Sequence, residues 1–559
     1  MPRSSKQLRP WRDPAPMRPA ATLMLLRDGP QGLEVLMTRR SATASFAPGA
    51  YVFPGGVVDQ ADRDLAQQAA NNTTALVARR ANQDANELAW AIAACREATE
   101  ELGIVMARSN RADDKRAYIA PDRLDRDKPL ISQLAQLQAH WATDEVHSFS
   151  HWQTDQDLPR RFDVRFMVAK IPSDQIPIAD EGEQFEPEWI VPAEGLARYE
   201  RGEFNIIFPT IRTLRVLATF KTAGKVIAHC ETQKELPFFL PRAGYFSGQD
   251  SRHTADEMQF GELHLVSPDG QINHHLDWHT DKAVPLLKHV QRLTCPNPGM
   301  MTGPGTNTYI VGEGTQFVVI DPGPDDAGHI ARIATIVGAH LIAILCTHSH
   351  PDHHPGAKRL QNLAAANGAR HVAISGVAMP HAYPQADGSL RSTDYETPSA
   401  WAFTPEHPLK HGDCITVGDC TIRAIHTPGH ASNHVCFLLE EDQLLFSGDH
   451  ILNGVTPIIN PPDGDMQAYL DSLSYLATLD FDFILPAHGY VLAPAKLAIT
   501  KLIAHRLKRE AKVIAAMDRL RTNDVDVLVA AVYDDVDSRL HPMARRSLLA
   551  HLIKLNKAN

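Results

Sequence analysis

The stretch THSHPDHHPG at residues 347–356 constrains this chain of 559 residues more than any other part of it. Four histidines and one aspartate lie there within seven consecutive residues. The apolar run Leu341–Cys346 precedes them and is typical of a buried strand, so the polar stretch begins where the chain leaves a sheet. A solvated loop is the alternative interpretation, because a single histidine is more often a surface or core residue than a ligand.

The spacing of these side chains predicts two metal ions. His348 and His350 are two residues apart, so in an extended segment both point to one side and can bind the same cation. Asp352 and His353 lie in the turn beyond and face elsewhere. A second cation beside the first is therefore geometrically reasonable.

Three later strand-like runs also end in side chains that bind metals. They are Thr421–Ile425 before His430, Gln443–Phe446 before Asp449, and Phe481–Leu485 before His488. Because α/β sheets build their sites where strands end, we expect these side chains to converge on the first stretch. The neighbouring His354, His426, His434 and His450 are interpreted as structural residues or as partners of the ligands.

The stretch THSHPDH resembles the HxHxDH signature of the metallo-β-lactamase superfamily, and the resemblance covers about residues 290–500. It implies an αββα sandwich with a binuclear site. It assigns His348, His350 and His430 to one metal, Asp352, His353 and His488 to the second, and Asp449 to both as a bridge. Imidazole-rich ligands favour two Zn²⁺, and the carboxylates leave Mn²⁺ or Fe open.

The resemblance also implies hydrolysis, with Asp352 among the catalytic residues. A hydroxide that bridges two cations can attack an ester, thioester, lactone or phosphodiester. Three segments, 301–312, 483–492 and 503–510, resemble the β-lactamase-like endoribonucleases and their bacterial relatives, which carry a winged-helix tail. Because this branch includes thioesterases, an RNA phosphodiester and an acyl thioester both remain candidates.

The tail, residues 501–559, is locally basic in an acidic chain. It carries twelve Lys and Arg against seven Asp and Glu, whereas the net charge of the whole chain is −11. This charge suits a polyanion such as RNA, and a solvated helical face explains it almost as well. The chain stops where the third helix of a winged-helix domain should end, so a β-wing is short or missing.

REATEELGI at 96–104 predicts a second site. On a helix Glu97, Glu100 and Glu101 share one face, where they can bind Mg²⁺ or Mn²⁺ that clamps a diphosphate. Gly103 then ends the helix. The alternative is an acidic turn that faces solvent.

REATEELGI and FPGG at 53–56 resemble the two parts of the Nudix box, in the group of coenzyme A diphosphatases. The resemblance over about residues 18–235 implies a Nudix α/β/α sandwich, metal binding and catalysis by the three glutamates, and Arg96 as a brace of the loop. Met37, Ser45 and Asp62 depart from the pattern of this group. A nucleotide or coenzyme A sensor without turnover therefore remains the alternative.

Together these features predict an α/β multidomain chain. We expect a flexible tail at 1–17, a Nudix-like domain at 18–235, a connector at 236–288, a metallo-β-lactamase domain at 289–500 and a helical, winged-helix-like domain at 501–559. Within these parts the residue pattern predicts a long, Ala-rich helical stretch from Asp64 to Leu102 and a short strand at Glu262–Ser267.

The composition limits which partners and which cellular compartment are expected. No stretch reaches the roughly 18 apolar residues of a spanning helix, so no membrane partner is expected. Seven cysteines without a CxxC pair favour reduced thiols and a cytoplasmic protein. The expected partners are a small nucleotide or coenzyme A-type substrate, and RNA if the tail binds it.

Overall fold

The computed structural model describes residues 4–44, 46–81, 83–110, 117–378 and 403–558. The chain divides into two compact units, Pro14–Pro241 and Met1–Asp13 together with Arg242–Asn559. Ser45, one of the predicted departures from the coenzyme A pattern, lies outside the described residues.

The N-terminal unit is built on one eight-stranded sheet with the order β10-β7-β8-β1-β2-β3, to which β4 and β9 add by pairing with β1 and β2. Its strands are β1 (Met17–Gly29), β2 (Gly32–Arg40), β3 (Tyr51–Val52), β4 (Gly55–Val57), β7 (His147–Gln153), β8 (Arg161–Lys170), β9 (Gln184–Ile190) and β10 (Phe238–Phe239). β5 (Ala107–Ser109) and β6 (Ala139–Trp141) form a separate pair.

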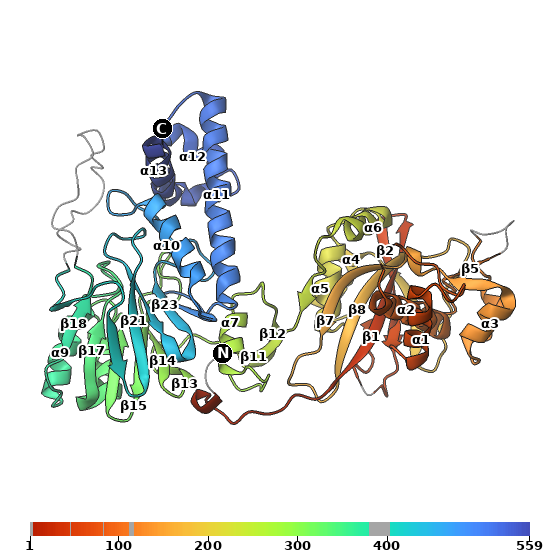
Figure 1. The fold of residues 1–559 in the computed structure, drawn as a ribbon, viewed down its shortest axis with the longest axis horizontal. Coiled ribbons are helices and arrows are strands. Elements are labelled where there is room, and N and C mark those ends of the chain that lie inside the picture. Colours follow the sequence, from red (N-terminus) through yellow and green to blue (C-terminus); the bar gives the residue numbers. More distant parts are fainter. Residues whose placement is uncertain (1–3, 45, 82, 111–116, 379–402, 559) are drawn as a thin grey trace. The chain divides into compact units, whose positions relative to one another are not determined.

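Helices cover both faces of this sheet (Figure 1). They are α1 (Gln60–Ala70), α2 (Ala85–Leu102), α3 (Leu130–Leu137), α4 (Pro192–Glu200), α5 (Phe208–Leu217) and α6 (Ala223–Thr232). Alternate residues of β1 face opposite sides: Leu23 packs with α1 and α2, whereas Met24 packs with α5 and α6. The unit is thus a helix–sheet–helix sandwich.

The predicted helical stretch from Asp64 to Leu102 is not continuous, because it is divided between two helices. The first ends at Ala70, and Asn72 then takes a left-handed conformation with φ 55°. The second begins after Asp84, whose side chain caps it by accepting from the Glu87 amide. It ends at Gly103, with φ 64°, as predicted.

The C-terminal unit is built around two large sheets packed face to face. The first has seven strands, β13 (Val284–Leu287), β14 (Val290–Thr294), β15 (Asn307–Glu313), β16 (Gln316–Ile320), β17 (Leu341–Leu345), β18 (Ala373–Gly376) and β19 (His407–Pro408). The second has β20 (Cys414–Val417), β21 (Cys420–His426), β22 (Val435–Leu439), β23 (Leu444–Gly448) and β24 (Phe483–Pro486). Residues of both sheets, such as Val318 and Phe437, form one core between them.

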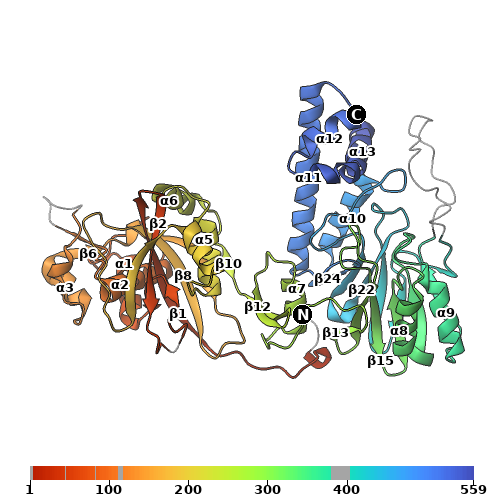
Figure 2. The ribbon, with the colours of Figure 1, turned by 180° about the vertical axis from the view of Figure 1, so that it is seen from behind.

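Helices cover the two outer faces of these sheets. α8 (Ala327–Val337) and α9 (Gly356–Ala366) pack on the first sheet, and α10 (Met466–Thr478) with the start of α11 (Ala495–Leu520) packs on the second. Figure 2 shows this order of layers from behind. The predicted αββα sandwich is therefore confirmed.

The segment before β13 holds β11 (Arg242–Phe246), β12 (Gln249–His253) and α7 (Phe260–Val266). The predicted strand at Glu262–Ser267 is wrong, because this stretch is helical. All its residues except the half-buried His264 are buried, and so short a buried stretch does not distinguish a helix from a strand.

Three helices form the tail: α11, α12 (Val525–Val532) and α13 (His541–Ala558). They enclose a small core of their own that includes Val513, Leu528 and Leu548. Within residues 495–558 the structure assigns no strand. None of the helices in the described part of the chain combines the length and apolarity that a membrane crossing requires.

Candidate metal centre

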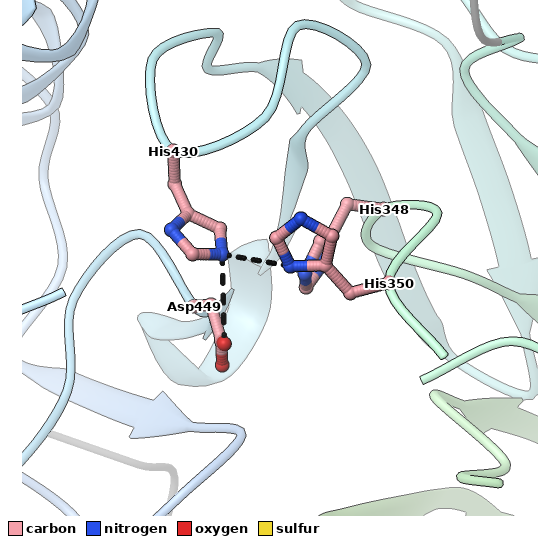
Figure 3. A group of neighbouring side chains, drawn as sticks. All are labelled: His348, His350, His430 and Asp449. Carbon is pink, nitrogen blue, oxygen red and sulfur yellow. Dashed lines mark hydrogen bonds and ion pairs between the residues drawn. The ribbon is translucent and has the colours of Figure 1, made fainter. Parts of the chain in front are cut away.

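The first group of predicted ligands comes together from three strand ends. His348 and His350 follow β17, His430 follows β21, and Asp449 follows β23. Their ligand atoms all lie within 4.8 Å of one another (Figure 3). The His430 Nε2 atom is 3.1 Å from His350 Nδ1, and neither ring points away from the group.

The second group lies beside the first and contains Asp352, His353 and His488. The Asp352 Oδ2 atom is 3.4 Å from His353 Nε2 and 3.3 Å from His488 Nε2. His488 reaches this group from the end of β24, which runs parallel to β23. The parallel pairing explains why two residues about forty apart meet at one edge.

Asp449 lies between the two groups. Its Oδ2 atom is 3.6 Å from His430 Nε2 in the first group. Its Oδ1 atom is 3.6 Å from His353 Nε2 and 3.2 Å from His488 Nε2 in the second. One carboxylate thus turns one oxygen to each group, as a bridging ligand requires.

The donor atoms fit a pair of divalent cations. His348 Nε2 is buried without a hydrogen-bond partner, and burying such an atom unpartnered costs free energy. Two ligands bound to one Zn²⁺ at about 2.0–2.1 Å in a tetrahedron lie about 3.3 Å apart. The contacts of 3.1–3.6 Å between the donor atoms of these groups match that spacing.

In three of the predicted histidine ligands, the Nδ1 atom contacts an acceptor oxygen of the protein. His430 Nδ1 lies 2.8 Å from the Ile458 carbonyl oxygen, and His488 Nδ1 lies 3.2 Å from that of Gly305. His353 Nδ1 lies 3.0 Å from Asp321 Oδ2. Because each acceptor requires the proton on Nδ1, the lone pair of Nε2 is left for the site.

Asp321 was not among the residues predicted for the site. This aspartate follows β16 with φ 48° and is buried. It accepts from the Thr347 amide and hydroxyl, both at 2.7 Å, besides its contact with His353. An acid directly after the apolar run Phe317–Ile320 is the same pattern that marks Asp449, so the sequence did carry the information.

The electrostatics divide the histidines into two classes. Burial, together with neighbouring rings, holds the pKa of His348 well below its usual range and lowers that of His350 to about 3. Burial opposes a charge on His488 as well, but Asp449 and Asp352 raise its pKa to about 10. The first class is therefore neutral, whereas a cation binding to the second must displace a proton.

The remaining histidines of this region lie outside the two groups. The His434 ring is 5.1 Å from the His348 ring, and its Nδ1 lies 2.9 Å from the Thr427 hydroxyl. Among the described residues a third group, His289, Cys420 and Asp442, also brings three donor atoms within 4.8 Å. It is buried, and His289 Nε2 lies 2.8 Å from Asp442.

Comparison with known proteins decides the family. Residues 301–488 match the metallo-beta-lactamase superfamily, and residues 525–559 match the beta-lactamase associated winged helix domain. An atrochrysone carboxyl ACP thioesterase of Aspergillus chevalieri is 34% identical over 250 residues, which cover 43% of this chain and 71% of that protein. The chain belongs to the metallo-beta-lactamase superfamily.

Two further proteins are similar to parts of this chain. The beta-lactamase-like protein 2 homolog of Drosophila melanogaster is 30% identical over 282 residues, which cover 49% of this chain and 89% of that protein. A NUDIX hydrolase structure from Alicyclobacillus acidocaldarius matches with 27% identity and a TM-score of 0.34, over 40% of this chain and 98% of that one. As a member of the metallo-beta-lactamase superfamily, the chain is a metal-dependent hydrolase with a helical winged-helix tail.

Outside the metallo-beta-lactamase domain, the predicted glutamates lie on α2 around Arg96. The Arg96 Nη1 atom donates to Glu97 and Glu100 at 2.8 Å each. Its Nη2 atom donates to the Val57 carbonyl at 2.8 Å and to Asp62 at 3.0 Å. Arg96 therefore braces the loop after β4, and Asp62 serves as one of its anchors.

Glu101 occupies a more enclosed position. Its carboxylate accepts from the Gly55 amide at 2.9 Å and from Gln184 Nε2 at 2.8 Å. Burial raises the pKa of Glu101 to about 8 and that of Glu97 to about 7. These glutamates are not among the groups of described residues whose donor atoms lie within 4.8 Å of one another.

Proposed function

We propose that the metallo-beta-lactamase domain binds two cations and hydrolyses an acyl thioester. The observation that carries the proposal is the convergence of seven predicted side chains into two groups that share Asp449. His348, His350 and His430 would hold one cation, and Asp352, His353 and His488 the other. Zn²⁺ suits these ligands best, and Fe or Mn²⁺ are the alternatives.

When bound, the cations would polarise the scissile carbonyl and lower the pKa of a water molecule. The protein contributes orientation, because Asp321 and the carbonyls of Ile458 and Gly305 keep the ligand rings in one tautomer. Asp352 is the more exposed of the two carboxylates, with 26% of its side chain accessible against 12% for Asp449. We assign Asp352 the transfer of the water proton to the departing sulfur.

Exposed apolar side chains in the loops that contact the ligands favour an acyl substrate. Met300 and Met301, 70% and 48% exposed, stand in the β14–β15 loop, whose Gly305 carbonyl contacts His488. Val455, 54% exposed, stands in the loop that also contacts His430. An acyl chain can cover such groups, and a phosphodiester backbone gains little from them.

Ion pairs within the tail support the same choice. Five of its cations form ion pairs with acids of the tail itself: Arg509, Lys512, Arg539, Arg545 and Lys554. These cations are already paired, which weakens the case for a polyanion. Several relatives with similar sequences are named acyl carrier protein thioesterases, which agrees with this proposal.

The experiment compares three substrates on the zinc-loaded protein. We expect hydrolysis of acyl-coenzyme A or acyl-pantetheine thioesters, with the released thiol measured by a thiol reagent, and loss of this activity in His348→Ala. Cleavage of single-stranded RNA but not of thioesters would make the site a nuclease. A protein inactive on both, in Zn²⁺, Mn²⁺ and Fe²⁺, refutes the proposed hydrolysis.

For the N-terminal unit we propose a Nudix-like diphosphatase that cleaves a coenzyme A-type nucleoside diphosphate with Mg²⁺ or Mn²⁺. The supporting observation is Arg96, which joins the Val57 carbonyl to Glu97 and Glu100. Glu97, Glu100 and Glu101 would hold the cation, and Glu100 and Glu101 would act in catalysis. The alternative is a sensor that binds the nucleotide without turnover.

The two alternatives are separated by product analysis with coenzyme A, ADP-ribose and NADH. We expect phosphate-bearing products from the wild type and none from Glu100→Gln, with Glu194→Gln on α4 as an exposed control. Binding without products supports the sensor. Turnover that Glu100→Gln leaves unchanged excludes these glutamates as the site.

A further inference from the structure

Three consecutive residues of the loop between β23 and α10 connect the metal centre to the helical tail. The Ile458 carbonyl accepts from His430 Nδ1 at 2.8 Å. The preceding carbonyl, of Pro457, accepts from Arg506 Nη2 on α11. The following amide, of Ile459, donates to Ser547 Oγ on α13 at 3.3 Å.

These contacts are shielded from water. Arg506 is 4% exposed, Ser547 6% and His430 7%, and Ile459 is fully buried. Hydrogen bonds in such surroundings are stronger than in water, and a donor left without its partner is costly. The loop is therefore held on one side by the tail and on the other by a predicted ligand.

Arg506 also supports the bridging ligand from a second direction. Its guanidinium lies 5.1 Å from the centre of the Tyr469 ring. The Tyr469 hydroxyl donates to the His450 carbonyl at 2.8 Å, and His450 follows Asp449 directly in the chain. One buried cation of α11 thus contacts the supports of both His430 and Asp449.

A second buried arginine of the same helix contacts residues of the tail itself. Arg509 is 7% exposed and lies 4.3 Å from the Tyr533 ring. It donates to the Val532 carbonyl at 2.6 Å and to Asp535 at 2.7 Å. All these partners belong to the tail, so Arg509 stabilises the tail without reaching the loop of Ile458.

We propose that the helical tail positions His430, with Arg506 and Ser547 as positioning residues that act through Pro457–Ile459. The tail would thereby set the affinity of the cation held by His348, His350 and His430. This inference rests on the proposed function only in taking His430 as a metal ligand. It gives the winged-helix tail a role in building the metal centre, independent of any partner that the tail binds.

The test measures metal release from the full-length, zinc-loaded protein by a chromophoric chelator. Loss of a partner that orients a metal-bound histidine typically lowers affinity by about 10- to 100-fold. We expect Arg506→Met to lower the affinity of one of two zinc ions by about that factor, and Ser547→Ala to have a smaller effect. Arg506→Lys retains a donor and should recover part of the affinity.

Arg509→Met is the matched control, because it removes an equally buried arginine of α11. It should lower the unfolding midpoint but release both zinc ions as the wild type does. The absorption spectrum of the Co²⁺-substituted protein gives a second readout: we expect Arg506→Met to change the Co²⁺ bands while its circular dichroism stays that of the wild type.

The outcomes separate this inference from the proposed function. If Arg506→Met retains the zinc affinity of the wild type, or if Arg509→Met lowers it as much, the tail does not position His430, although thioester hydrolysis by the wild type still supports the function. A wild type that binds no zinc, manganese or iron overturns both.

Discussion

Replacing Glu262 of α7 should lower the free energy of unfolding of the C-terminal unit by a measurable amount. The side chains of Glu262 and Arg292 are almost completely buried. Arg292 donates to both carboxylate oxygens, through Nη1 and, at 3.1 Å, through Nη2. His274 Nε2 lies 2.8 Å from the same carboxylate. Glu262→Gln keeps the shape of the side chain but leaves the charge of Arg292 without its counterion.

The size of the effect follows from the pKa of Glu262. Burial alone would raise this pKa, but Arg292 and His274 overcome it and lower the value from 4.5 to about 2. At about 1.4 kcal/mol for each pH unit, this difference corresponds to about 3 kcal/mol of stability at neutral pH. Breaking a buried ion pair by removing one partner costs a similar amount, about 3–5 kcal/mol.

The lowered pKa of Glu262 also determines whether stability rises or falls with pH. Because the folded pKa lies below the unfolded one, the contribution is complete above pH 4.5 and is lost as the pH falls towards 2. At pH 3.5 about 1.4 kcal/mol of it should be gone. The difference between wild type and Glu262→Gln should shrink by that amount between pH 7 and pH 3.5.

Urea unfolding followed by tryptophan fluorescence measures this difference, since Arg292 lies 4.5 Å from the ring of Trp278. Glu313→Gln at an exposed position of β15 is the control and should change stability by less than about 0.5 kcal/mol. A loss below about 1 kcal/mol for Glu262→Gln at pH 7, or a loss that stays constant down to pH 3.5, would refute the reasoning.

Three further predictions concern the metal centre. Asp321→Asn should lower the affinity for one zinc ion by about 10- to 100-fold in chelator competition, because the acceptor of His353 Nδ1 loses its charge; equal zinc release from variant and wild type would contradict this. Gly448→Ala should lower the unfolding midpoint, because a Cβ there meets His434 Nε2 at 2.7 Å and φ is 50°; an unchanged thermal transition would speak against it. Met300→Lys should raise KM for long-chain acyl thioesters and leave short-chain ones unchanged, and equal KM changes for both lengths would exclude an acyl contact.

The sequence indicated which side chains converge at the sheet edge, because their signal is local. A strand shows as an apolar run, and a ligand that follows it directly is placed at the sheet edge, as for His348 after β17 and Asp449 after β23. The αββα sandwich and the helical tail followed from the family that these ligands indicate. Their assignment to individual cations stays a prediction.

The groups that hold the ligand rings in place could not be identified from such a sequence pattern. His430 and His488 bond to backbone carbonyls of Ile458 and Gly305, and a carbonyl belongs to every residue type. Arg506 lies 76 positions after His430, so only tertiary packing brings the two into one network. The helix limits were missed for another reason. The break after Ala70 depends on the left-handed conformation of Asn72 and on Asp84, which caps the next helix, and such side chains can also occur within a helix.

Anomalous diffraction at the zinc edge, from crystals grown with excess zinc, tests the central claim most directly. Two peaks should be present, one among His348, His350 and His430 and one among Asp352, His353 and His488, with an Asp449 oxygen facing each. A map in which either group has no peak, or in which Asp449 faces neither ion, would contradict the binuclear centre.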